Sequence, residues 1–145
     1  MNQKFAIFFA FICLISCKND DDSLRDDNPY LNDPIVNLNI NLNLPQYDPL
    51  KFPGNHIILN QQGIRGIVVY NVNNELYTAF DLSDPNHLPN QCSAMTIEGI
   101  IASCPCPADD NEYDIVTGSH KTNTSAYPMQ QYRARRSGNF VEVTN

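Results

Sequence analysis

The chain has 145 residues, with 16 acidic against 9 basic side chains, a formal net charge of −7, five Cys and no Trp. This length fits one ordinary domain and excludes a multidomain enzyme. Nucleic acid is not an expected partner, because a negative surface repels phosphate backbones and no stretch is rich in Lys and Arg.

Residues 1–16 are predicted to be a lipoprotein signal peptide. The apolar run at residues 5–15 is too short to anchor a protein as a membrane helix, but it suits a signal-peptide core. It ends in Leu14-Ile15-Ser16-Cys17, which resembles the lipobox of bacterial lipoproteins. The resemblance implies that Cys17 is acylated and becomes the first mature residue, so the expected partner is a membrane, bound through several acyl chains. The alternative is an ordinary secretory signal that Cys17 merely follows.

Residues 17–33 are predicted to form a flexible acidic tether. The segment is rich in Asp and Asn and has almost no apolar side chains, so it cannot offset the entropy cost of ordering. Lys18 followed by acidic residues also resembles the surface-export signals of lipoproteins from Bacteroidetes-type bacteria, although a solvated linker has the same composition. The expected location is the bacterial cell envelope, lipid-anchored at the outer membrane and facing either the periplasm or the surface.

Residues 34–145 are predicted to be one all-β domain. Apolar residues alternate with Asn from Val36 to Leu44, which predicts a strand with one buried face. Three Pro and a Gly predict a loop at residues 45–55. Residues 67–80 predict a hairpin that turns at Asn73-Asn74. Further short strands are expected at residues 57–59, 95–97, 100–103, 113–116, 131–136 and 140–143. This pattern predicts an antiparallel β-sandwich or small barrel.

Three cysteines remain in the predicted domain, namely Cys92, Cys104 and Cys106. Outside the cytoplasm, an odd number allows at most one intramolecular disulfide. A bond between Cys104 and Cys106 would close a tight ring, so the geometry favours a bond from Cys92 to either of the other two.

The segment Cys104-Pro105-Cys106, followed by Tyr113 to Gly118, resembles the second box of Rieske iron–sulfur domains. Upstream, Gly66–Tyr70 and Tyr77–Asp81 resemble the strands that lead to the first box; residues 127–143 resemble the closing strands. The resemblance covers about residues 57–145. It implies a Rieske-like all-β fold.

The ligand positions of the resemblance are largely lost. A Rieske cluster binds through two Cys and two His. Cys104 matches a ligand of the second box, whereas Pro107 occupies the His position. In the first box, either Asp84 and Asn86 replace Cys and His, or Pro85 replaces Cys while His87 stands in for His. Since no register supplies that Cys, we expect no bound cofactor. The alternative is a 2Fe–2S cluster or another metal held through Cys104, Cys92 and His87.

The resemblance also implies a disulfide between Cys92 and Cys106, because these positions correspond to the last Cys of each box. Cys104 would then be the odd thiol. We expect it to be buried and inert; the alternative is a reactive or metal-bound thiol.

Other candidate sites compete with these. His87 with the three Cys has the donor types of a zinc site, but the disulfide uses the same sulfurs. The acidic residues 109–114 have the donors of a calcium loop but lack its Gly, so a solvated loop is expected. His56 and His120 are expected at the surface. Arg133 and Arg135 share a strand face, which suits either an anionic partner or a charged edge strand.

Two functional hypotheses follow. The first is a non-catalytic envelope lipoprotein that serves as a structural or binding module for an unidentified envelope protein. The second is an electron-transfer protein of the Rieske class with a 2Fe–2S cluster or another metal. No catalytic triad, phosphate loop or pair of catalytic carboxylates can be assembled from the sequence, so we do not expect an enzyme.

Overall fold

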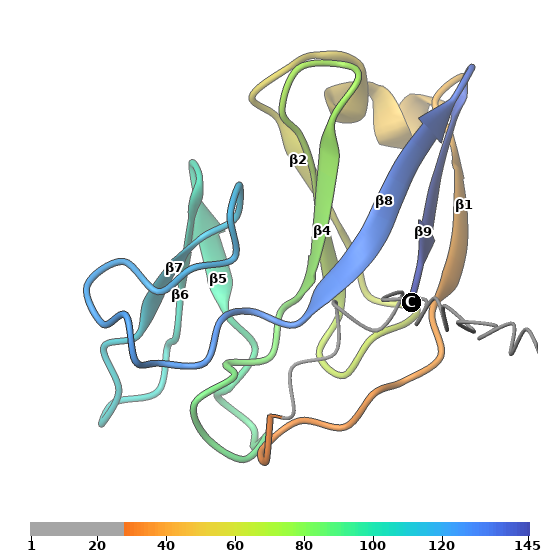
Figure 1. The fold of residues 1–145 in the computed structure, drawn as a ribbon. Coiled ribbons are helices and arrows are strands. Elements are labelled where there is room, and N and C mark those ends of the chain that lie inside the picture. Colours follow the sequence, from red (N-terminus) through yellow and green to blue (C-terminus); the bar gives the residue numbers. More distant parts are fainter. Residues whose placement is uncertain (1–27) are drawn as a thin grey trace, which may run out of the picture.

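The computed structural model describes residues 28–145 (Figure 1). The predicted signal peptide, Cys17 and most of the predicted tether lie outside the described residues. The rest of the tether segment contacts the domain. Asn28 Nδ2 donates to the Pro85 carbonyl at 2.8 Å, and the Tyr30 ring meets the Tyr127 ring edge-on with centroids 6.1 Å apart. The end of the predicted tether therefore lies against the β domain.

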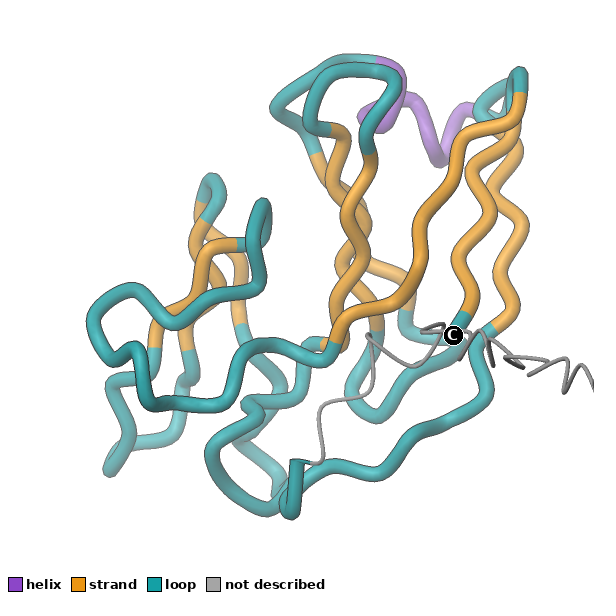
Figure 2. Tube along the Cα trace, in the orientation of Figure 1, coloured by secondary structure: helices purple, strands orange, loops and turns teal. Residues whose placement is uncertain are grey.

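Within residues 28–145, nine strands form two antiparallel sheets (Figures 1 and 2). The larger sheet has the order β1-β9-β8-β4-β3-β2, and the smaller has the order β5-β6-β7. The strands are β1 (Asn37–Asn41), β2 (His56–Leu59), β3 (Ile67–Asn71), β4 (Tyr77–Asp81), β5 (Thr96–Glu98), β6 (Ile101–Ser103), β7 (Glu112–Asp114), β8 (Gln131–Ser137) and β9 (Phe140–Thr144). The predicted all-β class is confirmed.

β3 and β4 are buried along their whole length because they lie between two cores. Side chains alternate between the two faces of β3, so Ile67 and Val69 pack into one core, formed by residues of the larger sheet and η1 (Pro45–Lys51). Val68 and Tyr70 point into the second core, which includes Ala102 and other residues of the small-sheet region. The predicted hairpin between β3 and β4 is confirmed, and Asn74 in its turn has a φ of 71°.

Several predicted boundaries were wrong by one or more residues, and two of the wrong ones lie near the start of the domain. β1 ends at Asn41, although the alternation continues to bury Leu42. The predicted loop at residues 45–55 contains a 3-10 helix, η1 (Pro45–Lys51), which is the helix coloured in Figure 2. Pro45 suits the first helical turn, where its missing N–H has no partner to lose. The fully buried Leu50 side chain draws this helix onto the core.

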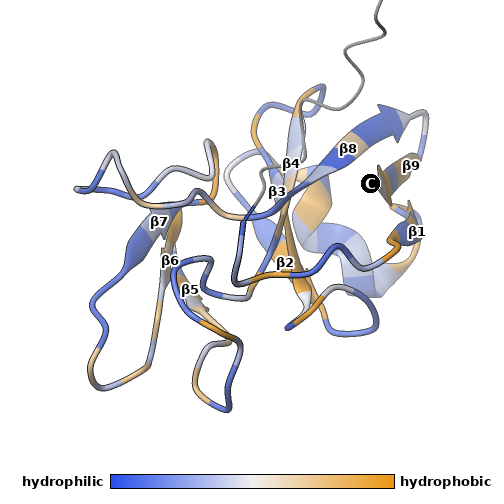
Figure 3. Ribbon diagram, turned by 60° about the horizontal axis from the view of Figure 1, so that its bottom comes forward, coloured by the Kyte–Doolittle hydropathy of each residue, from blue (hydrophilic) through white to orange (hydrophobic). Residues whose placement is uncertain are grey.

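The basic strand β8 is not an edge strand. β9 pairs with it from Arg133 to Ser137, and β4 pairs with its first residues. Its far end is hydrophilic in Figure 3, whereas β2 is hydrophobic. Arg136 uses its guanidinium within the chain, donating to the carbonyls of Gly138 and Asn74. Over residues 28–145, no helix is both long and apolar enough to cross a membrane.

Candidate metal centre

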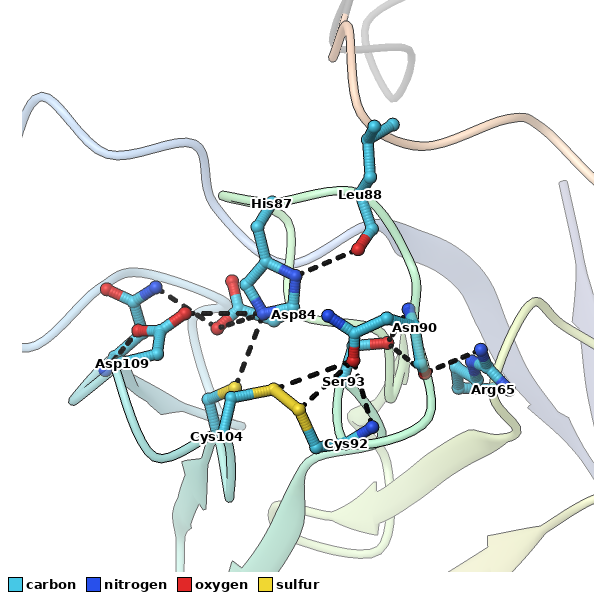
Figure 4. Close-up of a disulfide and its surroundings, with 11 residues drawn as sticks. Arg65, Asp84, His87, Leu88, Asn90, Cys92, Ser93, Cys104 and Asp109 are labelled. Carbon is cyan, nitrogen blue, oxygen red and sulfur yellow. Dashed lines mark hydrogen bonds and ion pairs between the residues drawn. A yellow bond between two sulfur atoms is a disulfide. The ribbon is translucent and has the colours of Figure 1, made fainter.

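Two loops meet at one end of the small sheet and carry most of the candidate residues (Figure 4). The first, residues 82–95, connects β4 to β5, and the second, residues 104–111, connects β6 to β7. The disulfide between Cys92 and Cys106 joins them, with a Cα–Cα distance of 5.1 Å. This is the pair that the Rieske resemblance implies. Residues distant in sequence are thereby held against one another.

Cys104 is the free cysteine of the described residues, and it is buried directly after β6. Its backbone N–H donates to the Asn111 carbonyl at 3.0 Å, which fixes the loop at this point. Burial, together with the negative charges of Asp84 and Asp109, raises the pKa of the Cys104 thiol to about 12. Without a metal ion the thiol therefore stays protonated and is a poor nucleophile.

His87 points its Nε2 atom into the space between the two loops (Figure 4). Nε2 lies 3.4 Å from Cys104 Sγ, 3.2 Å from Asp109 Oδ2 and 3.8 Å from Asp84 Oδ2. The other ring nitrogen, Nδ1, lies 3.0 Å from the Leu88 carbonyl oxygen. A carbonyl oxygen only accepts, so Nδ1 is the donor of this hydrogen bond and Nε2 is the nitrogen directed at the sulfur and the carboxylates.

Asp84 is a fully buried carboxylate beside His87. Its Oδ1 accepts from the Asn86 N–H at 2.8 Å and from the Tyr113 hydroxyl at 3.0 Å. Its Oδ2 accepts from Asn111 Nδ2 at 3.1 Å. A carboxylate has about four acceptor positions, so one position remains on Oδ2, the oxygen that faces His87.

Polar side chains behind Asp84 fix its position. Burial raises the pKa of Tyr113, so its hydroxyl keeps the proton that it donates to Asp84. Asn111 also contacts His120, whose Nε2 lies 3.1 Å from Asn111 Oδ1 and whose ring packs edge-on against Tyr113. His120 is therefore a half-buried member of this network.

Of the positions that the Rieske resemblance assigns to altered ligands, Pro107 and Asn86 lie apart from the space around His87 Nε2, whereas Asp84 lies beside it. Pro107 is exposed and offers no donor. Asn86 turns to the Tyr113 hydroxyl and the Tyr127 backbone. Each of the two registers for the first box has one residue at this point, Asp84 in the first and His87 in the second, and His87 lies against Cys104. The described residues do not supply a two-Cys, two-His set here.

Four donor atoms do converge, from Asp84, His87, Cys104 and Asp109, all within 4.8 Å of one another. A two-iron cluster needs donors arranged around two separate irons, two of them thiolates. One thiol and three donors gathered at a single point do not fit that group. The sequence indicated Asp84 only as the replacement of a Cys ligand and Asp109 only as a donor of a calcium loop, and it did not predict that the two carboxylates meet. Asp84 and His87 stand three residues apart, a spacing that lets both face one point of a turn.

The alternative donor sets predicted from the sequence lack free donors at a common point, although His87, Cys104 and the disulfide-bonded Cys106 also lie together. Cys92 and Cys106 share the disulfide, which removes them from a zinc site with His87. In the acidic segment, Glu112 pairs with Lys121 at 2.8 Å, and this hydrogen bond lowers the pKa of Glu112. Asp114 Oδ1 caps the Val116 N–H at 2.6 Å. These carboxylates do not point at a common centre.

The site opens to the outside through a depression of about 520 Å³, whose lining includes His87, Asp109 and Pro107. The side chains of His87 and Asp109 are 23% and 18% exposed, whereas that of Asp84 is fully buried. A small ion can therefore reach the donors from the side of His87 and Asp109.

Comparison with known proteins gives structural neighbours but no family. No family profile and no curated protein matches the chain. A chain from the complex of reduced oxygenase and oxidized ferredoxin in carbazole 1,9a-dioxygenase aligns at 20% identity with a TM-score of 0.45, covering 63% of this chain and 82% of that one. A ferredoxin of Sphingomonas yanoikuyae B1 aligns at 22% identity and a TM-score of 0.44, covering 65% and 88%.

The ferredoxin of carbazole 1,9a-dioxygenase from Nocardioides aromaticivorans IC177 aligns at 16% identity and a TM-score of 0.44, covering 64% of this chain and 86% of that chain. At such values we derive from these neighbours neither a ligand nor an activity for this chain. The described residues themselves form a Rieske-like all-β fold, in which the segments resembling the two Rieske boxes lie side by side and are joined by the disulfide.

Proposed function

We propose that this chain is a lipid-anchored protein of the bacterial envelope, whose Rieske-like domain holds no 2Fe–2S cluster and acts as a structural or binding module. The observation that carries the proposal is the cysteine arrangement. Among residues 28–145, Cys104 is the one free thiol, because Cys92 and Cys106 are bonded to each other. A Rieske cluster requires two Cys ligands on one iron.

The disulfide supports a stable domain without a cluster. It joins the two loops that a cluster would otherwise cross-link, and it closes a loop with a sequence separation of 14. In the chain-entropy model, a loop of this size stabilises the folded state by about 3 kcal/mol. The lost metal–ligand bonds are thus replaced by a covalent cross-link in a compartment that favours disulfides.

The cluster is tested on the full chain, purified from an envelope fraction in detergent. We expect less than one iron and no acid-labile sulfide per chain, no visible absorption band, and one Cys104 thiol labelled after denaturation. Two irons and two sulfides per chain would establish the alternative, a Rieske-class electron carrier, and would overturn the proposal.

The anchor is tested separately, because it rests on the lipobox alone. We expect the wild-type chain to incorporate labelled fatty acid and to sediment with membranes. Replacement of the acylated cysteine, Cys17→Ser, is expected to abolish both properties. A wild-type chain that carries no lipid would refute the anchored location without affecting the conclusion about the cluster.

A further inference from the structure

We propose that Asp84, His87, Cys104 and Asp109 form a site for a single divalent metal ion, of which Zn²⁺ is the best-matched. The proposal goes beyond the module function and is independent of the lipid anchor. It rests on the convergence of four donors from two loops, one sulfur, one nitrogen and two carboxylate oxygens, within 4.8 Å of one another. Zn²⁺ accepts all three donor types.

The donor spacing fits one tetrahedral ion. With Zn–S of about 2.3 Å and Zn–N and Zn–O of about 2.0–2.1 Å, a tetrahedral site places its sulfur and nitrogen about 3.6 Å apart and its nitrogen and oxygen about 3.4 Å apart. The corresponding distances here are 3.4 Å from His87 Nε2 to Cys104 Sγ, and 3.2 and 3.8 Å from Nε2 to the two carboxylate oxygens. Small side-chain movements would complete the coordination.

Supporting hydrogen bonds orient the donors as they do around protein-bound zinc. A ligating His commonly donates its second ring N–H to a carbonyl or carboxylate, and the Leu88 carbonyl fills that role for His87 Nδ1. Asn111 supports both carboxylates, since its side chain donates to Asp84 Oδ2 and its backbone N–H donates to Asp109 Oδ1 at 3.0 Å. The site is thereby preorganised by neutral groups.

The negative charges of Asp84 and Asp109 also favour a bound cation. Asp84 is fully buried, and the ion pairs found in residues 28–145 give Asp84 and Asp109 no Lys or Arg, only the same His87 nitrogen. A divalent ion would neutralise both carboxylates, and Cys104 would release its thiol proton to solvent on binding. Four protein donors would fill the coordination sphere of the ion and leave no position for water or substrate. This is the arrangement of structural rather than catalytic zinc.

The test uses the full chain, freed of metal with a chelator and titrated with Zn²⁺ and, in parallel, with Co²⁺. We expect one ion per chain and, for Co²⁺, the absorption bands of a tetrahedral ion together with a thiolate-to-cobalt charge-transfer band. An absent charge-transfer band, or stoichiometric binding of neither ion, would overturn the proposal. Neither result would restore a 2Fe–2S cluster, so failure here is distinguishable from failure of the proposed function.

Matched variants locate the ion. Loss of a residue that only supports a metal ligand typically lowers metal affinity about 10- to 100-fold. His87→Gln and Asp109→Asn each remove a ligand, so we expect them to lower Zn²⁺ affinity by more than this. The controls are His56→Gln, on β2, and Asp110→Asn, whose side chain is exposed beside Asp109. Equal affinities in the variants and the controls would refute the assignment. A cooperative denaturant-unfolding transition like that of the wild type shows that each variant is folded. The Co²⁺ spectrum of the wild type tests the sulfur ligand without any substitution.

Discussion

His87 Nε2 lies 3.4 Å from Cys104 Sγ, although the two residues are 17 positions apart. The contact exists because the disulfide between Cys92 and Cys106 pins one loop against the other, next to Cys104 in sequence and space. The same cross-link therefore also brings together the two loops that carry the donors of the proposed metal site. Loss of the disulfide should therefore lower both the free energy of unfolding and the affinity for the metal ion.

The first prediction removes the disulfide. The double variant Cys92→Ala/Cys106→Ala, studied without metal, should lose about 3 kcal/mol of unfolding free energy, since its unfolded chain regains the entropy of an open loop. Denaturant unfolding measures the loss. The matched control, Cys104→Ala, replaces a buried free thiol and should cost about 1 kcal/mol. A control as unstable as the double variant would contradict the entropic role of the bond.

The second prediction concerns Asp81, the fully buried carboxylate at the end of β4. Its oxygens accept from four donors, namely the N–H groups of Ile64 at 2.6 Å, Ser83 at 2.8 Å and Arg65 at 3.3 Å, and the Tyr132 hydroxyl at 2.9 Å. Asp81→Asn would turn an NH₂ group toward donors and leave some of them unpaired. We expect it to cost more than about 2 kcal/mol in denaturant unfolding.

The control for Asp81 is Asp48→Asn. Asp48 pairs with Lys51 at 2.6 Å on the exposed surface, and such pairs contribute less than about 1 kcal/mol. Comparable losses in the two variants would show that the carboxylate network around Asp81 does not hold this end of the sheet.

The third prediction is a pH dependence. Burial lowers the pKa of His56 in the folded state below its ordinary value. As pH falls below about 6.5, the unfolded chain takes up a proton that the folded chain does not, so stability falls; it stops falling below the folded pKa. His56→Gln should reduce the loss of stability between pH 7.5 and pH 5.5, measured by denaturant unfolding. Every other titrating group is common to both proteins, so an unchanged loss would contradict this assignment.

Sequence patterns predicted the parts of the fold in which apolar residues follow a regular strand pattern. The apolar run from Ile67, with the Asn pair that follows, was sufficient to predict β3, β4 and their turn. The η1 helix was missed because its seven residues include two Pro, which predict a loop, and because it depends on one buried side chain, that of Leu50. A contact of this kind leaves no repeat in the sequence.

The candidate site was predictable only in part. The residues left the partner of Cys92 open between two sulfurs, and the family resemblance indicated Cys106. Asp84 and Asp109 come from two aperiodic loops, and nothing local to either loop specifies that they meet at His87. Their convergence follows from the disulfide and from Asn111, which are relationships of the folded chain.

The fourth prediction concerns Asn111, which contacts no proposed ion but supports both carboxylates. Asn111→Ala removes the hydrogen bond to Asp84 Oδ2 and frees that oxygen to turn away, so Zn²⁺ affinity should fall about 10- to 100-fold. One ion per chain and the thiolate-to-cobalt band should remain, because all four donors remain. Competition with a chelator measures the affinity, and the exposed Asn43→Ala variant is the control. A complete loss of stoichiometric binding would mean that Asn111 is itself a ligand, and an unchanged affinity would mean that Asp84 does not bind the ion.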